Sequence, residues 1–474
     1  MKKILIFGHF NLLHTGHIRL FQYAKSLGGS LIIAVESDKI AGKKVSENQN
    51  ERLNIIKKIK IIDKAFIYSD NLEKTILKVK PDIIVKGKEF ENKSNPEEKI
   101  LKKIGGKLIF SSGFAFYNTK FKLQKEPKNK LILKKQVNFL KKRKLINFNF
   151  IDHLESLKKL RVCLIGDLII DEYINCIPLG MSREDFSIVI SPKKKESYLG
   201  GAAIVAKHIA GIGAKVDFYS LVGNDLEGKR ALNELRKIKN INPFLLNEKF
   251  RNTTIKQRFI VDDKVNSRIT YLEERSLDTL FEKKFFNMIS SKIDKYDLLV
   301  LSDFNYGLLT ENLSKMILDL FKKNKICIVA DSQSSSQRGN LSKFYGSNLI
   351  LPTEYEARQH VKSNDDGLVV LCEKLRSSLN AKNIILKIGK NGIFVHKHLS
   401  KNTWDDDRID AMNEFPKNLT GAGDAMLALS SLSFAKKRNI WIASYLGSIA
   451  SAIQIAKEQN TNFEFEDIKE FFLD

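Results

Sequence analysis

Short runs of apolar residues alternate along the chain with longer segments whose apolar positions recur at helical spacing. The first run, at 2–7, reads KKILIF and is followed at 18–25 by a segment with the period of an amphipathic helix. Further strands are expected at 31–38, 65–68, 82–85, 107–110, 161–167, 215–220, 298–301, 326–330, 349–351 and 384–388. Strands that alternate with helices predict parallel sheets covered on both faces, and therefore an α/β fold class.

A lysine-rich stretch separates two such alternating regions. We therefore expect two doubly wound parallel-sheet domains, 1–123 and 159–474, joined by a basic linker at 124–158 that contains a short helix at 131–140. A chain of 474 residues is long enough to bury two cores. In the second domain, 252–274 alternates like antiparallel strands and predicts a small β lid over a ligand.

Composition narrows the class of protein. The chain has 43% hydrophobic and 28% charged residues, and no apolar run approaches the roughly 18 residues of a membrane span, so we expect a cytoplasmic protein with no membrane partner. The four cysteines lack metal-ligand spacing and are expected to be reduced. Much of the formal charge of +25 is local, because 120–144 hold eleven Lys or Arg and one acid. No aromatic and basic recognition module accompanies this charge, so we expect anionic small molecules rather than nucleic acid.

The turn after the first predicted strand carries candidate phosphate chemistry. It reads GHFNLLHTGH over residues 8–17. The start of a helix offers unpaired N–H groups and the positive end of its dipole, and Gly16 lets a phosphate approach the backbone closely. His14 and His17, three residues apart, can lie on one side of the first turn and donate hydrogen bonds to phosphoryl oxygens. The pattern predicts a nucleoside triphosphate site; the alternative is a capping or surface pair of histidines.

This motif resembles the cytidylyltransferase-like family of nucleotidyltransferases. The resemblance implies a Rossmann-like domain that transfers a nucleoside monophosphate from CTP or ATP to a phosphorylated small molecule, with His14, His17, Lys43 and Lys44 as catalytic residues. It also implies nucleotide and phosphate contacts at Gly8, His9, Phe10, Asn11, Gly16, Arg52, Lys86, Gly87, Ser111 and Ser112. Thr119 and Lys120 remain an alternative to the two serines, and for any single lysine a solvated surface charge remains an alternative.

A second glycine-bordered helix start lies near the other end of the chain, in NLTGAGD at 418–424. Gly421 and Gly423 leave backbone N–H groups free at the helix N-terminus, which makes an anion hole for a phosphoryl group in transfer. Asp424, in the first turn, is placed to take a proton from an attacking hydroxyl. The alternative interpretation of Asp424 is an acid that pairs with the helix dipole.

These motifs resemble the ribokinase-like sugar kinases of the PfkB family over residues 160–474. The resemblance implies Asp424 as catalytic base, and Glu356 as the residue that organises Mg²⁺ through its water. It implies nucleotide and phosphate contacts at Lys387, Gly389, Thr420, Gly421, Ala422 and Gly423, and sugar contacts at Asp171, Gly200 and Gly201. Ile204, Thr353 and Asn418 depart from the family pattern, which has asparagine, asparagine and an acid there. Because the base and the anion hole remain, we predict kinase activity.

The two domains together predict consecutive reactions. The pair resembles the bifunctional heptose 7-phosphate kinase and heptose 1-phosphate adenylyltransferase family, with the order of the domains reversed. That resemblance implies ATP, Mg²⁺ and an ADP-heptose product for surface polysaccharide. A phosphorylated sugar needs a cationic pocket, for which the candidates are Arg183, Lys256, Arg258 and Arg268; the alternative is that they are exposed charges on strands. The alternatives are a different sugar or polyol phosphate joined to CMP from CTP, and a ligand-binding scaffold with one inactive domain. A homodimer through the lid is left open.

Overall fold

The computed structural model describes residues 2–10, 15–42, 45, 47–87, 90, 94–111, 135–182, 184, 187–248, 250–262, 264–333, 339–400 and 403–473. The chain divides into two compact units, Met1–Lys128 and Asn129–Asp474, and each is described by itself. Within the described ranges, no helix is both long and apolar enough to cross a bilayer.

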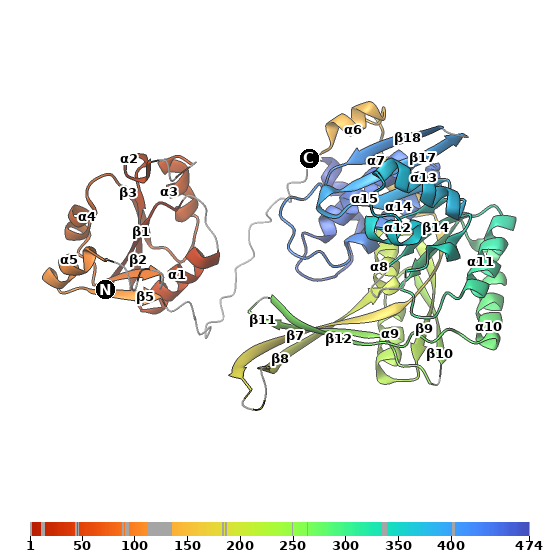
Figure 1. Ribbon diagram of the computed structural model, residues 1–474, viewed down its shortest axis with the longest axis horizontal. Coiled ribbons are helices and arrows are strands. Elements are labelled where there is room, and N and C mark those ends of the chain that lie inside the picture. Colours follow the sequence, from red (N-terminus) through yellow and green to blue (C-terminus); the bar gives the residue numbers. More distant parts are fainter. Residues whose placement is uncertain are drawn as a thin grey trace. The chain divides into compact units, whose positions relative to one another are not determined.

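The first unit is built on a parallel sheet of five strands (Figure 1). The strands are β1 (Lys3–Gly8), β2 (Ser30–Glu36), β3 (Lys64–Tyr68), β4 (Ile83–Gly87) and β5 (Lys107–Ser111). The helices are α1 (Thr15–Ser26), α2 (Asp38–Ala41), α3 (Gln49–Lys57), α4 (Leu72–Val79) and α5 (Glu97–Lys103). The strand order is β3-β2-β1-β4-β5, so the winding reverses between β1 and β4. The predicted doubly wound sheet is confirmed.

Alternate side chains of each strand fill two cores on opposite faces of this sheet. Ile4 of β1 belongs to a cluster with Phe21 of α1 and Ile56 of α3. Its neighbour Leu5 belongs to a second cluster with Leu101 of α5. The helices therefore cover both faces and leave the carboxyl ends of the strands as the open edge, where α/β sheets bind ligands.

The second unit is larger and contains two sheets. The strands of the main sheet are β6 (Arg161–Gly166), β9 (Lys215–Gly223), β10 (Ile241–Glu248), β13 (Leu298–Asp303), β14 (Cys327–Ser332), β15 (Leu349–Ile350), β16 (Asn383–Lys387), β17 (Ile393–Ser400) and β18 (Thr403–Ile409). The order is β10-β9-β6-β13-β14-β15-β16-β17-β18, parallel as far as β16 and antiparallel from there. The sequence did not predict the hairpin β17–β18.

Helices cover both faces of this main sheet. They are α6 (Val137–Lys142), α7 (Phe150–Leu157), α8 (Ala202–Ile212), α9 (Leu226–Arg236), α10 (Thr279–Ser290), α11 (Glu311–Lys323), α12 (Glu354–Val361), α13 (Leu368–Leu379), α14 (Ala422–Lys437), α15 (Ile440–Gln454) and α16 (Phe465–Leu473). Leu164 of β6 packs in one core with α8, α14 and α15, whereas Ile165 packs in the other with α10, α11 and α13. The helix α14 is buried over most of its length, so its N-terminus is held rigidly at the sheet edge.

A four-stranded lid extends from the main sheet (Figure 1). It comprises β7 (Leu168–Met181), β8 (Ile188–Gly201), β11 (Ile255–Val261) and β12 (Lys264–Tyr271), in the order β12-β11-β7-β8. The predicted antiparallel pair is β11 and β12. The longer pair β7–β8 was missed, because prolines, a lysine run and two register shifts interrupt its alternation.

Part of the stretch that we predicted to be a linker packs on the second unit. The helices α6 and α7 bury Phe139, Phe150, Leu154 and Leu157 in the same core as α14 and α15. Among the four cysteines, Cys163, Cys327 and Cys372 are buried, Cys176 is half-buried, and all are free thiols.

Candidate active sites

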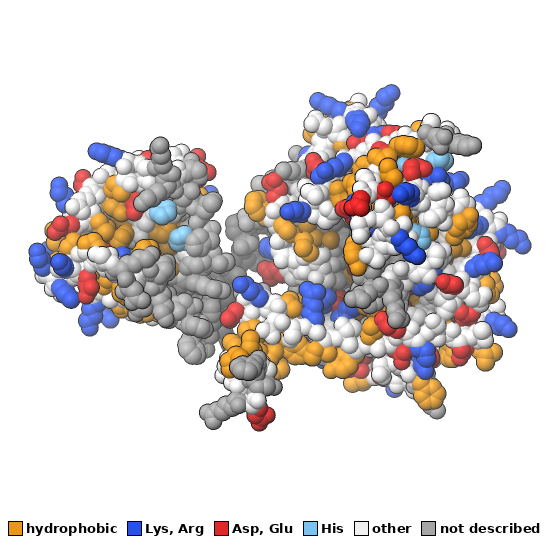
Figure 2. All heavy atoms as spheres, in the orientation of Figure 1, with side chains coloured by type: hydrophobic (Ala, Val, Ile, Leu, Met, Phe, Trp, Pro, Cys, Tyr) orange, Lys and Arg blue, Asp and Glu red, His pale blue; other side chains and the backbone are white. Residues whose placement is uncertain are grey.

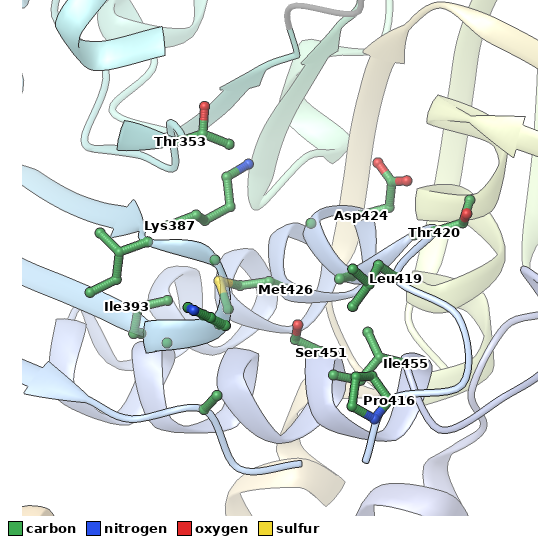
Figure 3. Close-up of a pocket in the computed structure, with 18 of the residues that line it drawn as sticks. Thr353, Lys387, Ile393, Pro416, Leu419, Thr420, Asp424, Met426, Ser451 and Ile455 are labelled. Carbon is green, nitrogen blue, oxygen red and sulfur yellow. The ribbon is translucent and has the colours of Figure 1, made fainter. Parts of the chain in front are cut away.

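A cavity of about 1470 Å³ opens at the carboxyl ends of the parallel strands of the second unit (Figure 3). Its wall includes many of the residues that the sequence predicted for a kinase: Asp171, Gly201, Lys256, Arg258, Glu356, Lys387, Gly389, Thr420, Gly421, Ala422, Gly423 and Asp424. These residues come from the lid, from the strand β16 and from the start of α14. The topology thus brings together segments more than 200 residues apart in the sequence.

Asp424 lies in the first turn of α14 and is almost fully buried. Its Oδ1 accepts a hydrogen bond of 2.7 Å from Nε2 of Gln333, which follows β14. Burial, and to a lesser extent the carboxylate of Asp331, raise the pKa of Asp424 to about 7 against the opposing effect of Gln333 and Lys387. A carboxyl group with a pKa near neutrality is suited to general acid–base chemistry.

Lys387 ends β16 and points into the same space as Asp424 (Figure 3). Its Nζ donates to both oxygens of Asp331, at 2.8 and 2.7 Å. Burial lowers the pKa of Lys387, but the carboxylates of Asp331 and Glu356 outweigh this effect and raise it, so the ammonium stays charged. The cavity wall therefore holds a charged ammonium, 12% exposed, beside the carboxylates of Asp331 and Glu356.

The glycine turn before α14 lies next to this cation. Gly421 has φ of 79°, and a Cβ there would lie 2.1 Å from Oδ1 of Asn460, so only glycine fits. A Cβ on Gly423 would lie 3.5 Å from Nζ of Lys387, so the backbone of the turn faces the ammonium. The side chain of Asn418 accepts a hydrogen bond of 2.9 Å from the backbone N–H of Thr420. Asn418, a departure from the family pattern, thus shapes the turn.

Glu356 and Thr353 form a capping box at the start of α12. The backbone N–H of Thr353 donates to Oε2 of Glu356 at 2.7 Å, and the backbone N–H of Glu356 donates to Oγ1 of Thr353 at 3.2 Å. Thr353, the second departure, is therefore the N-cap of α12. Ile204, the third, is fully buried in α8.

The lid provides the other end of the cavity. Nη1 of Arg258 donates to Oδ1 of Asp171 at 2.7 Å. A Cβ on Gly200 would lie 2.1 Å from Oδ2 of Asp171, so the absence of a side chain there leaves room for that carboxylate. The Nζ of Lys256 lies 5.1 Å from the ring centre of Phe304 and 5.3 Å from that of Tyr306.

One of the predicted lid cations lies apart from this group. Arg268 lies directly opposite Arg258 on β12, a strand that is exposed along its length. It is absent from the cavity wall, because β12 is the outer strand of the lid.

Sequence reasoning did not single out Asp331 and Gln333. Both follow the strand predicted at 326–330, so a polar residue directly after a buried strand was the available signal. Burial raises the pKa of Asp331 to about 6, despite its ion pair with Lys387.

In the first unit, β1 ends at Gly8 and the chain turns through His9 and Phe10 before α1. Phe10 is buried with φ of 46°, a strained conformation for a large side chain. Its ring packs edge-on against His17, with 5.5 Å between ring centres, and against Phe21. His9 is exposed, and Gly16 lies in the first turn of α1. In the described part of the motif, His17 therefore packs on a buried phenylalanine.

Arg52 was expected to contact the nucleotide, and the structure places its guanidinium in internal contacts. It is fully buried and donates to the carbonyl of His9 at 2.5 Å, to the carbonyl of Glu47 at 3.0 Å and to Oδ1 of Asp38 at 2.6 Å. It ties the turn after β1 to the segment after β2.

Lys86 and Gly87 end β4, next to the reversal of winding. Lys86 pairs with Glu97 and donates to Asn95 at 2.7 Å, with its ammonium 4.8 Å from the ring centre of Phe90. Gly87 pairs in register with Ser111 at the end of β5. Asn11, His14, Lys43, Lys44, Ser112, Thr119, Lys120 and Arg183 lie outside the described residues.

Comparison with known proteins fits both units. The model of the pfkB family carbohydrate kinases matches residues 159–466, and the cytidylyltransferase-like model matches residues 5–109. Two relatives are each named bifunctional protein HldE. The one from a Nitratiruptor species is 27% identical over 316 residues, 66% of this chain and 65% of the relative. The one from Helicobacter acinonychis is 29% identical over 312 residues, 65% of each chain.

Solved structures show the fold of the second unit. Ribokinase from Giardia lamblia has a TM-score of 0.55 at 14% identity, over 66% of this chain and 100% of its own. Arabidopsis thaliana ribokinase complexed with ribose and ATP has a TM-score of 0.52 at 14% identity, over 66% and 98%. The chain spans about 65% of the length of the two HldE relatives. Since the kinase model covers well over half of the sequence, this chain belongs to the pfkB family of carbohydrate kinases.

Proposed function

We propose that the chain is a two-domain enzyme. In this proposal the second unit phosphorylates C1 of heptose 7-phosphate with ATP, and the first unit transfers AMP from ATP to a heptose 1-phosphate to give ADP-heptose. The observation that carries the proposal is the convergence of Asp424, the turn Gly421–Gly423 and Lys387 on one cavity whose far end holds lid cations. The word bifunctional in the names of the HldE relatives supports two activities, and heptose is the sugar that the resemblance of the motifs implies.

In the kinase reaction, Asp424 accepts the proton of the C1 hydroxyl as its oxygen forms a bond to the γ-phosphorus of ATP. The bond from that phosphorus to the β-phosphate oxygen breaks, and ADP leaves. Backbone N–H groups of the turn Gly421–Gly423 and the ammonium of Lys387 oppose the charge that builds on the phosphoryl oxygens. Asp171, fixed by Arg258, orients the sugar hydroxyls.

The oxygen donors of this cavity suit Mg²⁺. Carboxylates of Asp331 and Glu356 both act on Lys387, and hard cations prefer such oxygens. In the described ranges, no three carboxylate, histidine or cysteine side chains lie close enough to hold an ion by themselves. The phosphates of ATP would complete its ligands, with Glu356 acting through water. Bound there, Mg²⁺ neutralises phosphate charge.

A phosphorylated sugar fits the lid end of the cavity. Lys256 lies on the cavity wall against two aromatic rings, and within the described residues no carboxylate pairs with it. Arg258, though paired with Asp171, adds a second positive charge on the same strand. These cations support recognition of the 7-phosphate.

In the transferase reaction, a C1 phosphate oxygen attacks the α-phosphorus of ATP, and the bond to the β-phosphate breaks to release pyrophosphate. Such a phosphate is already anionic at neutral pH, so no protein base is needed. His17 at the start of α1 donates to the phosphates, and Arg52 positions the turn that carries the motif. Neither reaction removes the 7-phosphate, so a separate phosphatase must act between them.

The lid also supports a homodimer as part of this proposal. Large apolar side chains gather on its outer part, where Leu179 is 66% exposed, Met181 60% and Ile188 55% (Figure 2). A patch of this kind on an extended hairpin favours burial against a second lid.

Incubation of the purified protein with heptose 7-phosphate, ATP and Mg²⁺ tests the kinase half, and mass spectrometry should detect the 1,7-bisphosphate. Incubation with heptose 1-phosphate and ATP should give ADP-heptose and pyrophosphate. CTP in place of ATP tests the CMP-linked alternative. Absence of the bisphosphate while another sugar is phosphorylated would overturn the heptose assignment.

A further inference from the structure

The end of the strand β18 lines the kinase cavity on the side of Lys387 and Gly389, where the proposed function places the nucleotide. Arg408 lines the cavity, and so does the segment that continues from Asp410 to Pro416. The strand approaches η5 (Gly389–Asn391) closely, because a Cβ on Gly392 would lie 2.1 Å from the carbonyl oxygen of Ile409. Small shifts of β18 therefore change the width of this part of the cavity.

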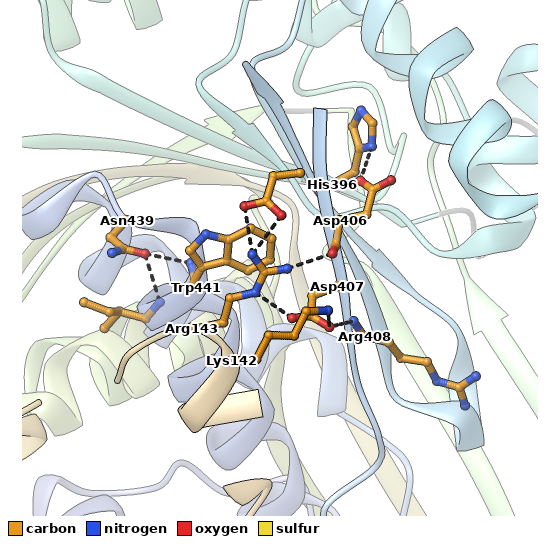
Figure 4. A network of polar contacts seen from close by, with 10 residues as sticks. Lys142, Arg143, His396, Asp406, Asp407, Arg408, Asn439 and Trp441 are labelled. Atoms are coloured by element: carbon orange, nitrogen blue, oxygen red, sulfur yellow. Dashed lines mark hydrogen bonds and ion pairs between the residues drawn. The ribbon is translucent and has the colours of Figure 1, made fainter. Parts of the chain in front are cut away.

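Arg143, directly after α6, holds this strand (Figure 4). Its Nη1 donates to both oxygens of Asp405 at 2.8 Å, its Nε to Oδ2 of Asp407 at 2.5 Å and its Nη2 to the carbonyl of Asp406 at 2.7 Å. Every nitrogen of the guanidinium is thus used on consecutive residues of one strand. The side chains of Arg143 and Asp407 are 8% and 11% exposed, so the charges are shielded from water.

The same guanidinium also contacts the helix α15. Its carbon lies 3.4 Å from the ring centre of Trp441, in the first turn of α15. Further along, α15 contributes Ser448, Ser451 and Ala452 to the cavity wall. Arg143 therefore contacts both β18 and α15 and fixes the distance between them. The proposed function places the nucleotide between these two elements.

Two neighbours of Arg143 also contact this strand. Nε2 of Gln136 donates to the carbonyl of Asp410 at 3.3 Å, at the point where β18 enters the cavity wall. Nζ of Lys142 donates to Oδ1 of Asp407 at 3.0 Å. Burial would raise the pKa of Asp407, but its hydrogen bonds from Lys142, from the backbone N–H of Arg408 and from Arg143 lower it below its ordinary value.

The other face of β18 is held independently. The imidazole of His396, fully buried on β17, lies with Nδ1 2.6 Å from Oδ1 of Asp406 and Nε2 2.7 Å from Oε1 of Glu373 on α13. The strand therefore stays in the sheet when Arg143 is removed, and what changes is its position against α15.

We propose that Arg143 is a positioning residue for the nucleotide of the kinase reaction, through which the segment joining the two domains sets the spacing of β18 and α15. The inference rests on the proposed kinase function. It extends the kinase unit to α6, which precedes the residues 159–466 matched by the family model.

The test compares full-length Arg143→Gln and Arg143→Lys with the wild-type protein. Loss of the guanidinium hydrogen bonds to β18 should raise KM for ATP by about fivefold to twentyfold. The kcat and the KM for the sugar phosphate should change less than about twofold. The Kd for a non-hydrolysable ATP analogue, measured by calorimetry, should rise in proportion. Lys142→Ala, which removes an exposed ion pair to the same carboxylate, is the matched control and should leave KM for ATP within about twofold.

A fall in kcat with both KM values unchanged would overturn the inference, because that result reports only a loss of folded enzyme. If the glutamine variant does not fold, Asp405→Asn removes one carboxylate of the pair, and an unchanged Kd in that variant would also overturn it. A wild-type protein that binds the analogue but phosphorylates no sugar would contradict the proposed function instead, and the Kd comparison would still decide the role of Arg143.

Discussion

The sequence singled out two helix N-termini, those of α1 and α14, and different kinds of side chain lie near each of them. The start of α14 is surrounded by buried ionisable groups, and burial raises the pKa of Asp424 to about 7 and that of Asp331 to about 6. Among the described residues near the start of α1, His17 and Phe21 pack on the ring of Phe10, and Arg52 binds the carbonyl of His9. The chemistry of the two proposed reactions explains the difference. A sugar hydroxyl must lose a proton as it attacks, whereas a sugar phosphate is already an anion.

The largest expected effect is on the kinase half. Asp424→Asn removes the base, so kcat for sugar phosphorylation should fall by about a thousandfold or more, while nucleotidyl transfer is unchanged. Steady-state assays of each half-reaction measure this. The folded-state pKa of Asp424 is raised to about 7, so stability falls as the pH rises from the ordinary pKa of the carboxyl to about 7, and asparagine should not lower Tm at neutral pH. A variant with normal kinase turnover would remove Asp424 from the mechanism.

The second-largest expected effect is on nucleotidyl transfer, the reaction proposed for the first unit. His17→Ala should lower kcat for nucleotidyl transfer by about a hundredfold, because one donor to the phosphates is lost, and should leave sugar phosphorylation intact. Pyrophosphate release reports the first activity and ADP formation the second. His17→Asn serves as the control for packing against Phe10. Equal losses in both assays would show that the two sites are not independent.

The next prediction concerns the lid. In Gly200→Ala, the new Cβ would lie 2.1 Å from Oδ2 of Asp171 and must displace that carboxylate. KM for the sugar phosphate should rise by about tenfold, with KM for ATP changed little. Gly367→Ala, where a Cβ meets open space, is the matched control. A rise confined to KM for ATP would contradict the placement of the sugar beside Asp171.

The smallest effect is in the pH dependence. Since the pKa of Asp424 is raised to about 7, the carboxyl holds a proton below that pH and cannot accept one. For phosphorylation, kcat/KM should therefore fall by about tenfold per pH unit below pH 7. In the proposed mechanism nucleotidyl transfer uses no base of the protein, so its kcat/KM should not show this fall between pH 6 and 8. A flat kinase profile over the same range would contradict the assignment of the base.

The sequence predicted most of the fold from periodicity, because the strands of both parallel sheets are short buried runs. It did not predict β7 and β8, whose outer parts are largely exposed, and Pro178 and Gly180 interrupt the outer part of β7. It also missed β17 and β18, where consecutive residues Asp405, Asp406 and Asp407 each contact a basic side chain from another element. Polar strands of this kind are stable only with partners that are distant in the sequence.

The sequence could indicate candidate site residues only where they lie next to one another in a single motif. The turn before Asp424 is contiguous in the sequence, and so is the turn before α1. Asp331, Gln333 and Arg143 hydrogen-bond to residues between 56 and 264 positions away, so only the folded chain reveals their partners. Arg52 illustrates the converse: its motif placed it near the nucleotide, but its fully buried guanidinium supports the backbone of the turn.

The central claim is that each helix start binds the phosphates of its own nucleotide. The most direct test is equilibrium binding of a non-hydrolysable ATP analogue to the full-length protein in the presence of Mg²⁺. The account predicts two bound molecules per chain, with phosphorus signals that respond separately to His17→Ala and to Arg143→Gln. A stoichiometry of one, altered by both substitutions, would contradict it.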